Sequence, residues 1–299
     1  MLLRSMPDLA PANQRFRAWF YTHWGRENCI ILGSTRNAGY EPYRQRLSIK
    51  MASGGGERYF IDGRTVVVDD DCYLVLNDNR TYASLIEAAQ SVESFSVFFR
   101  PGLMQDVLGA VCTSLHHSID PAPARAVELP ERLHPHDRTV TPVMRFIRHH
   151  IRAGVDDEQW YEEQLQVLAA RVLVQQRRQH REALRLDCVK ASTRAELSRR
   201  LALAADFIHS NHERDIGLIH MAQAACLSVH HFLRLFRTVY GLTPMQYLYR
   251  KRIAAALRLR ERGMPMQDVA AQAGFNSRAT FYRQWRRWAP ALRASSLNH

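Results

Sequence analysis

The sequence lacks the features that mark secreted, membrane-spanning or metal-binding proteins. Its 299 residues include five cysteines, an odd number, and no two of them have a C-x-x-C spacing. This pattern favours a reducing compartment over a disulfide framework or a cysteine zinc site. No apolar run approaches the roughly 20 residues that a bilayer span requires, and residues 1–13 contain no apolar signal segment. We therefore expect a cytoplasmic protein.

Acidic residues are scarce in the last third of the chain. Residues 194–299 contain 17 lysines and arginines against 6 acidic residues, a net charge of +11, whereas residues 1–193 contain 24 against 23. A basic segment joined to a nearly neutral one is typical of a protein that binds a polyanion. A solvated basic surface is the alternative that charge alone leaves open.

Residues 40–100 show short apolar runs separated by turn signals. Runs at 59–61 and 65–68 flank Asp62-Gly63, a strong hairpin signal, because a type I′ turn requires positive φ at both central residues. Other strands are expected at 43–49, 72–76, 81–86 and 94–99. Many short strands at this spacing predict a small barrel or sandwich.

Over residues 101–185 the apolar residues recur at the three- and four-residue intervals typical of helices. The longest helix is expected at 157–185, with an apolar stripe formed by Tyr161, Leu165, Leu168 and Val172. Such a narrow stripe packs either on the barrel or on a second chain, and we favour a dimer contact because the rest of this helix is densely charged. Residues 188–193 are predicted to link domain 1–187 to domain 194–299.

The basic segment contains one helix-turn-helix pattern twice. The first copy is Ala222-x-x-Ala225-Cys226-Leu227-Ser228, followed by Phe232-x-Arg234-x-Phe236-Arg237. The second, 48 to 49 residues later, is Ala270-x-x-Ala273-Gly274-Phe275-Asn276, followed by Phe281-x-Arg283-x-Trp285-Arg286. A pattern of this length does not recur by chance, and two such units on a basic segment point to duplex DNA.

Six helices are expected in this segment, at 194–211, 218–225, 229–240, 244–262, 265–273 and 278–288. Ser228 in the first copy, and Asn276 or Ser277 in the second, are placed to cap the helices at 229–240 and 278–288. Pro244 and Gly263 suit the start and end of an 18-residue connecting helix, about 27 Å long at 1.5 Å per residue. Such a strut holds two recognition helices near the roughly 34 Å of one DNA turn.

These residues carry a resemblance to a known family. Residues 194–293 resemble the DNA-binding domain of the AraC/XylS family of bacterial transcription regulators. The motifs are Ser228-x-x-x-Phe232-x-Arg234-x-Phe236-Arg237-x-x-x-Gly241-x-Thr243-Pro244 and Ala270-x-x-x-Gly274-Phe275. The front half resembles, less closely, the cupin-like effector barrel with dimerisation helices that many members have.

The resemblance implies an α+β protein: an N-terminal cupin-like barrel at 40–100, helices at 101–185 and an all-helical C-terminal domain. It also implies that two helix-turn-helix units lie in consecutive major grooves of promoter DNA. The implied base contacts are His230, Leu233, Arg234, Arg278, Ala279, Tyr282 and Arg283. Arg237, Arg286 and Arg287 stand near helix ends, where phosphate contacts are expected.

Three positions depart from the family pattern. Cys226 replaces the usual glycine of the first turn, and its position favours a buried structural cysteine. Trp285 stands where phenylalanine is usual. The second Gly-x-Thr-Pro exit is shortened to Trp288-Ala289-Pro290, and so the closing helix after it is expected to fray.

We expect no enzymatic activity and no cofactor. Residues 40–100 contain no histidine, which argues against a metal-dependent cupin enzyme tethered to DNA, and His134-x-His136 has no third ligand nearby. The expected partners are promoter DNA, a small organic effector and a second copy of the chain, with RNA polymerase as a further candidate. The sequence also allows a DNA-binding dimer that responds to no effector, and it does not distinguish an activator from a repressor.

Overall fold

The computed structural model describes residues 1–115, 129–183, 186 and 190–296. The chain divides into two compact units, Met1–Arg181 and Glu182–His299, which we describe separately. The N-terminal unit is built on a mixed β-sheet and the C-terminal unit is entirely helical, which confirms the α+β fold class. Among the described helices, none is both long and apolar enough to cross a bilayer.

The described residues of the N-terminal unit form eight strands in one sheet. Six of them follow the order β1-β2-β7-β3-β6-β8, and the hairpin β4-β5 joins through β4 to β7. The elements in chain order are β1 (Leu2–Leu3), α1 (Gln14–His23), β2 (Cys29–Gln45), β3 (Ser48–Ser53), β4 (Glu57–Ile61), β5 (Arg64–Val68), β6 (Cys72–Leu76), β7 (Arg80–Phe98), α2 (Leu103–Leu115), β8 (Leu133–Pro135), α3 (Thr141–Arg152) and α4 (Glu158–Ala183).

Several predicted strands have different limits in the structure. The sheet begins before residue 40, because β2 begins at Cys29, and the predicted strand 43–49 is divided between β2 and β3. The predicted strands 81–86 and 94–99 both belong to the long strand β7. Strand β2 pairs with β7 on both sides of its polar middle, at residues 80–87 and 92–98, and the register shifts where the pairing skips residues 88–91. The two predicted strands are therefore joined into one long strand by an irregular polar stretch.

Strand β7 changes its second neighbour along its length. Residues 82–85 pair with β4, whereas residues 93–98 pair with β3. The connection from β3 to β4 at residues 54–56 is all glycine, and a Cβ on Gly55 would lie only 2.6 Å from Cγ2 of Val92 in β7. The missing side chain thus allows this connection to pass close to β7 where the two neighbours separate.

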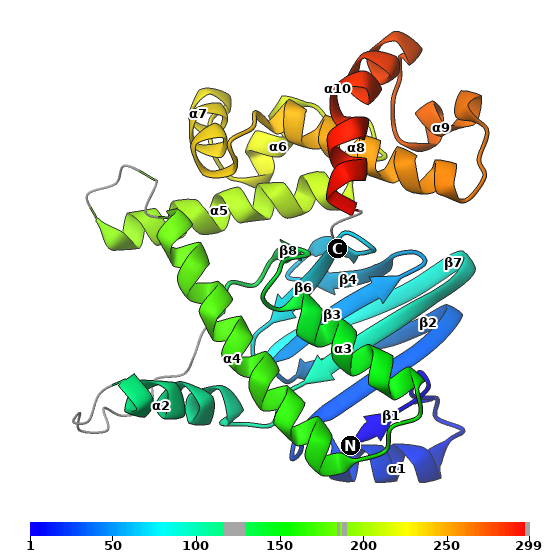
Figure 1. Cartoon of the computed structure of the whole chain (residues 1–299), viewed down its shortest axis with the longest axis vertical. Coiled ribbons are helices and arrows are strands. Elements are labelled where there is room, and N and C mark those ends of the chain that lie inside the picture. Colours follow the sequence, from blue (N-terminus) through cyan, green and yellow to red (C-terminus); the bar gives the residue numbers. More distant parts are fainter. Residues whose placement is uncertain (116–128, 184–185, 187–189, 297–299) are drawn as a thin grey trace. The chain divides into compact units, whose positions relative to one another are not determined.

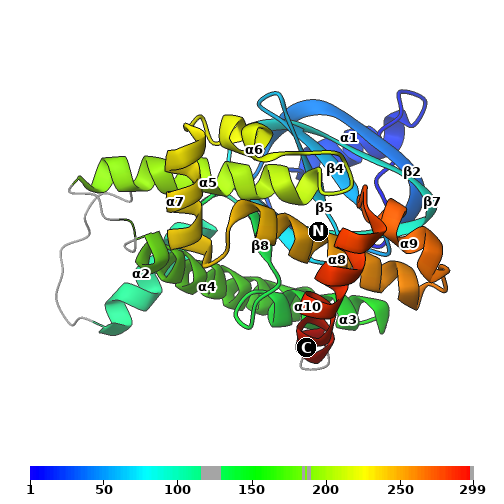
Figure 2. The same ribbon diagram turned by 90° about the horizontal axis from the view of Figure 1, so that it is seen from above.

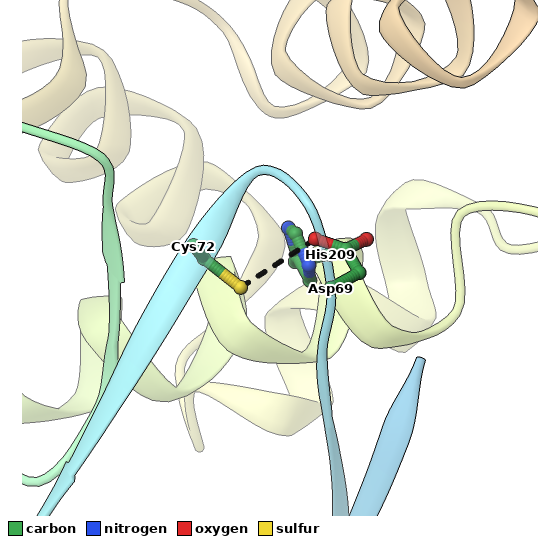
Figure 3. A group of neighbouring side chains, drawn as sticks. All are labelled: Asp69, Cys72 and His209. Carbon is green, nitrogen blue, oxygen red and sulfur yellow. Dashed lines mark hydrogen bonds between the residues drawn. The ribbon is translucent and has the colours of Figure 1, made fainter. Parts of the chain in front are cut away.

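Two turns define how the smaller strands connect. Asp62 and Gly63 have φ values of +48° and +72°, so the predicted left-handed hairpin turn between β4 and β5 is confirmed. Before β6, the Asp69 carboxylate accepts the backbone N–H of Asp71 at 2.9 Å and the Cys72 thiol at 3.6 Å. Figure 3 shows the thiol contact; His209, also labelled there, belongs to the C-terminal unit.

Helices α3 and α4 lie across one face of the sheet (Figure 1). Ile147 of α3 packs in the same buried core as Ile49 and Val97 of the sheet. This core also contains the whole predicted stripe of α4, namely Tyr161, Leu165, Leu168 and Val172. The prediction that the stripe forms a dimer contact is therefore wrong. The sheet presents an apolar face that this stripe covers within one chain.

The described part of the C-terminal unit forms six helices with two separate cores. They are α5 (Ala191–Ser210), α6 (Leu218–Ala224), α7 (Val229–Tyr240), α8 (Pro244–Glu261), α9 (Met266–Gln272) and α10 (Arg278–Ser296). Helix α8 runs between the pair α6–α7 and the pair α9–α10 (Figures 1 and 2). Leu248 of α8 belongs to the core formed with α5, α6 and α7, whereas Ile253 belongs to the core formed with α9 and α10.

The predicted helix limits agree closely with the structure except at two places. Helix α5 begins at Ala191, inside the predicted linker, of which residues 188–189 lie outside the described part. Helix α10 does not end at residue 288 but continues to Ser296 with Pro290 inside it. The shortened Trp288-Ala289-Pro290 sequence offers no glycine in the left-handed conformation to end the helix. The recognition helix and the closing helix are therefore one element.

Candidate functional site

The first helix-turn-helix unit is formed by α6, a tight turn and α7. Ala222 is buried where the helices meet, and its carbonyl accepts the N–H of Leu227 at 3.0 Å. Ser228 occupies the N-cap position with extended backbone, but its hydroxyl makes no capping hydrogen bond. The prediction of a side-chain cap is wrong here. Ser228 is exposed, so water can bind the first N–H groups of α7 instead.

The turns of the two units show the same backbone conformation with different residues. Cys226 has φ +50°, and Gly274, its counterpart, has φ +83°. The first turn therefore adopts the conformation that glycine favours, although a side chain is present. Cys226 is also exposed, so the prediction of a buried cysteine is wrong.

Helix α7 presents one buried face and one exposed face. Phe232 and Phe236 are fully buried, with ring centroids 5.2 Å apart, and Leu235 packs beside them. The opposite face carries the predicted contact residues: His230, Arg234 and Arg237 are exposed and Leu233 is half-buried. The burial pattern thus leaves the predicted residues free to meet a ligand along this face.

The second unit repeats this arrangement with α9 and α10. Phe281 is fully buried, and the Ser277 hydroxyl accepts the N–H of Thr280 at 3.4 Å, so Ser277 rather than Asn276 caps α10. Helix α10 exposes every residue predicted for it: Arg278, Ala279, Tyr282, Arg283, Arg286 and Arg287. The structure therefore groups the predicted residues on two helix faces, one in each half of the unit.

The arginines of these two faces are not neutralised within the protein. None of the six arginines at 234, 237, 278, 283, 286 and 287 forms an ion pair with another described residue. Arg283 only approaches the Thr280 hydroxyl at 3.4 Å, and Arg287 lies 5.0 Å from the ring centroid of Trp288. Unpaired guanidinium groups on a helix can bind phosphate oxygens or the O6 and N7 atoms of guanine.

The connecting helix α8 has a capping box at its start and a buried arginine in its middle, neither of which was predicted from the sequence. Thr243 and Gln246 form a capping box, in which the Thr243 hydroxyl accepts the N–H of Gln246 at 3.3 Å and the Gln246 side chain accepts the N–H of Thr243 at 3.0 Å. The Thr-x-x-Gln spacing signals such a cap. Arg252, in the middle of α8, is buried and donates hydrogen bonds to two backbone carbonyls, which no motif in the sequence indicates.

The N-terminal unit contains a pocket between α1 and the sheet, with a volume of about 40 Å³ and several aromatic side chains in its lining. The ammonium of Lys50 lies in it, 3.4 Å from the ring centroid of Phe98. Burial lowers the pKa of Lys50 to about 7, partly offset by the Glu57 carboxylate. Glu57 accepts the Ser94 hydroxyl at 2.7 Å. The pocket thus combines apolar walls with a few buried polar groups, as small-molecule sites do, but its volume is far below their roughly 300–1,000 Å³.

The pair His134 and His136 lies at the edge of the sheet. His134 is buried and stacks on Tyr73 with ring centroids 5.0 Å apart, and its Nε2 lies 3.2 Å from the Pro130 carbonyl oxygen. Nδ1 of His136 lies 3.2 Å from the Thr141 hydroxyl. Burial lowers the pKa of His134 to about 3 and that of His136 to about 4. Both imidazoles are therefore neutral packing groups near pH 7.

Comparison with known proteins places the C-terminal unit in a class. Residues 221–291 match the family model described as a helix-turn-helix domain, and this domain is of the AraC type. The matched residues include both turns and both exposed helix faces. The resemblance predicted for this part of the chain is confirmed.

Individual relatives match over the same region. A probable transcriptional regulator, LumQ of Photobacterium leiognathi, is 33% identical over 88 residues, which are 29% of this chain and 36% of that protein. The virulence regulon transcriptional activator VirF of Yersinia enterocolitica is 33% identical over 82 residues, 27% of this chain and 30% of that protein. The matched part thus spans about a third of these relatives.

One solved structure is the DNA-binding domain of AdpA in complex with a target DNA. It is 28% identical in sequence and has a TM-score of 0.29. The similarity covers 32% of this chain and 91% of that domain.

Proposed function

We propose that the chain is a transcription regulator that binds a specific promoter sequence through its C-terminal unit. The observation that carries the proposal is the pair of equivalent helix-turn-helix units, each exposing unpaired arginines on one helix face. The relatives LumQ and VirF, which match this region, are named as transcription regulators. Reading chromosomal DNA would place the protein in the cytoplasm, on the nucleoid. RNA polymerase is the partner through which such a regulator would act.

The exposed residues divide into base readers and phosphate binders. We assign base contacts to His230, Leu233 and Arg234 in α7. In α10 we assign them to Arg278, Ala279, Tyr282 and Arg283. Arg237, Arg286 and Arg287 lie further along the helices, where the groove wall brings phosphates near. Arginine is suited to both roles because its planar fork matches guanine edges as well as phosphates.

A comparison of two single variants tests this division. Arg234→Ala should relax sequence preference at one base position, at a cost of roughly 1–3 kcal/mol for the preferred base. Arg237→Ala should weaken binding to all sequences alike and reduce the slope of log K against log salt by about one. Both are measured by binding titrations on the genomic fragments that the wild-type protein enriches. Equal behaviour of the two variants would refute the assignment.

A small organic effector is proposed for the pocket around Lys50. The larger hollow near Arg80 and Arg100 is a weaker candidate, because Arg80 already pairs with Asp62 and Glu131 and Arg100 with Asp106. Lys50, by contrast, is buried over Phe98. Because the pocket holds only about 40 Å³, an effector would have to displace neighbouring side chains to enter it.

The effector proposal is tested with a panel of sugars, carboxylates and aromatic acids. A true effector should raise the melting temperature of the wild-type protein and change its affinity for promoter DNA. The response should be lost in Lys50→Met and kept in Lys190→Met, an exposed lysine outside this pocket. If no compound in the panel has either effect, the effector-independent regulator is the better description.

A homodimer is proposed through the outer face of α4. Val167 and Val174 are 42% and 54% exposed and stand one heptad apart. Ala170 lies between them, and the exposed Glu163 and Arg177 stand seven residues on either side of it. When two copies of α4 cross antiparallel at Ala170, Glu163 lies opposite Arg177 of the second copy, and Val167 lies within one residue of the level of Val174. The pattern is therefore self-complementary.

Charge variants test this pairing. Val174→Glu should make the protein monomeric in sedimentation analysis, whereas Gln166→Glu, on an exposed position of the same helix, should leave the dimer unchanged. Glu163→Arg should weaken the dimer and the added Arg177→Glu should restore it, because the charges then match again. A dimer that survives Val174→Glu would show that another surface holds the copies together.

An enzyme tethered to DNA is the alternative of a different class. Metal analysis of the purified protein separates the two: stoichiometric iron, zinc or manganese would favour the enzyme. We propose that the chain has no such activity, since its relatives are named as regulators.

A further inference from the structure

The two recognition helices belong to halves that have separate cores. The first half packs around Phe232 and Phe236 and the second around Phe281, and these cores share no buried residue. Helix α8 enters both, through Leu248 in the first and Ile253 in the second. Because the two cores share α8 alone, contacts between the halves outside these cores add to how firmly the halves are held.

Arg252 of α8 supplies contacts to both halves. It is 6% exposed, and its guanidinium donates from Nε to the His212 carbonyl and from Nη2 to the Arg214 carbonyl, both at 2.7 Å. These carbonyls lie in the segment between α5 and α6, which belongs to the first half. The same guanidinium lies 5.6 Å from the ring centroid of Phe275, in the turn of the second half. Buried charge-assisted hydrogen bonds of this length are strong and directional.

Gly274 brings the second turn against the same segment. A Cβ at this position would lie 2.6 Å from the His212 carbonyl oxygen and 2.8 Å from Cα of Glu213. These atoms are backbone and cannot move aside as a flexible side chain would. The turn of the second helix-turn-helix unit therefore rests directly on the α5–α6 segment of the first, at the place that Arg252 also holds.

We propose that Arg252 and Gly274 form a clamp that fixes the two recognition helices relative to each other and so sets the half-site spacing that the protein accepts. The inference rests on the proposed function, because spacing has meaning only if both helices read DNA. Arg252 acts as a positioning residue that touches no base. Adding one base pair between half-sites moves the second by about 3.4 Å and rotates it by roughly a tenth of a turn, which a rigid pair of helices cannot follow.

The test measures preference for spacing rather than affinity alone. Full-length wild-type protein first selects a two-part site from random DNA. The two half-sites are then joined with the selected spacing and with one or two base pairs added or removed. Wild type should bind the selected spacing about tenfold or more tighter than a spacing changed by one base pair, because a mismatch at one base pair typically costs about that factor. Arg252→Lys and Gly274→Ala should reduce this preference to about threefold or less, while binding to the first half-site alone is retained.

Matched variants control for charge and backbone strain. Arg250→Lys makes the same exchange at an exposed position of α8. Gly263→Ala adds a side chain at φ +88° with no atom within 4 Å. Both should keep the wild-type spacing preference. Arg252→Gln is the substitute if Arg252→Lys does not fold, as judged by its circular dichroism.

The outcomes separate the clamp from the proposed function. If wild type enriches a two-part site and the clamp variants keep its sharp spacing preference, the clamp is wrong and the DNA-binding function stands. If wild type binds all spacings equally, the clamp is also wrong. If wild type enriches no sequence at all, the proposed function itself fails.

Discussion

Cys226→Gly should stabilise the C-terminal unit. Cys226 holds φ +50° in the first helix-turn-helix turn, where its counterpart is Gly274. A side chain in the left-handed region costs roughly 1–2 kcal/mol. Glycine offsets part of this gain, because it loses more backbone entropy on folding, which costs roughly 0.5–1 kcal/mol of stability. Because Cys226 is exposed, little packing is lost, and the net gain should be about 0.5–1 kcal/mol.

The gain is measurable as a rise in melting temperature of roughly 2–6 °C for a unit of this size. Differential scanning calorimetry on the full chain is the assay, since the transition of the C-terminal unit should shift while any separate N-terminal transition does not. Cys226→Ala is the control, because alanine keeps the Cβ and so keeps the strain. If the melting temperature of Cys226→Gly is no higher than that of Cys226→Ala, the turn does not store this backbone strain.

Three further predictions concern stability. Burial lowers the pKa of His134 from 6.5 to about 3. Below pH 6.5 the unfolded chain therefore binds more protons than the folded chain. As the pH falls from 6.5 toward 4, this histidine should lower the free energy of unfolding of the N-terminal unit by up to about 1.4 kcal/mol per pH unit. Urea unfolding across that range should show a smaller slope for His134→Phe, and an unchanged slope would contradict this. Thr243→Ala removes the capping box of α8 and should lower the free energy of unfolding by about 1 kcal/mol, measured in urea. Thr238→Ala is the control and should be nearly neutral, because the Thr238 hydroxyl only bonds back to a carbonyl within α7. Phe281→Ala should cost about 3–5 kcal/mol, and proteolysis should open the second half before the first; simultaneous cleavage of both halves would argue against separate cores.

The C-terminal unit could be predicted well from the sequence because its signals are local. Phe232 and Phe281 stand at helical spacing, Pro244 and Gly263 mark the limits of α8, and a repeated pattern supports each interpretation with a second copy. The same locality explains why both exposed faces were predicted residue by residue. The burial of each face follows directly from the 3.6-residue period.

Contacts between distant segments were not predictable in this way. The stripe of Tyr161 and Leu165 fits a dimer as well as a sheet face, because periodicity shows that a face is buried and not what covers it. Strand β7 unites two predicted strands because β2 pairs with it on both sides of residues 88–91, which no local signal indicates. Arg252 resembles any other arginine of a basic helix until the carbonyls that it binds are brought near by the fold.

The glycine connection at residues 54–56 has a practical meaning for protein engineering. A run of three glycines suggests a flexible place at which to insert a reporter or a tag. Here the chain passes so close to Val92 that a single Cβ at Gly55 has no room, and an insertion would separate β7 from one of its two neighbours. The hairpin turn beside Gly63, where a Cβ would meet no atom within 4 Å, is the better place for an inserted label, provided that Gly63 itself is kept for its φ of +72°.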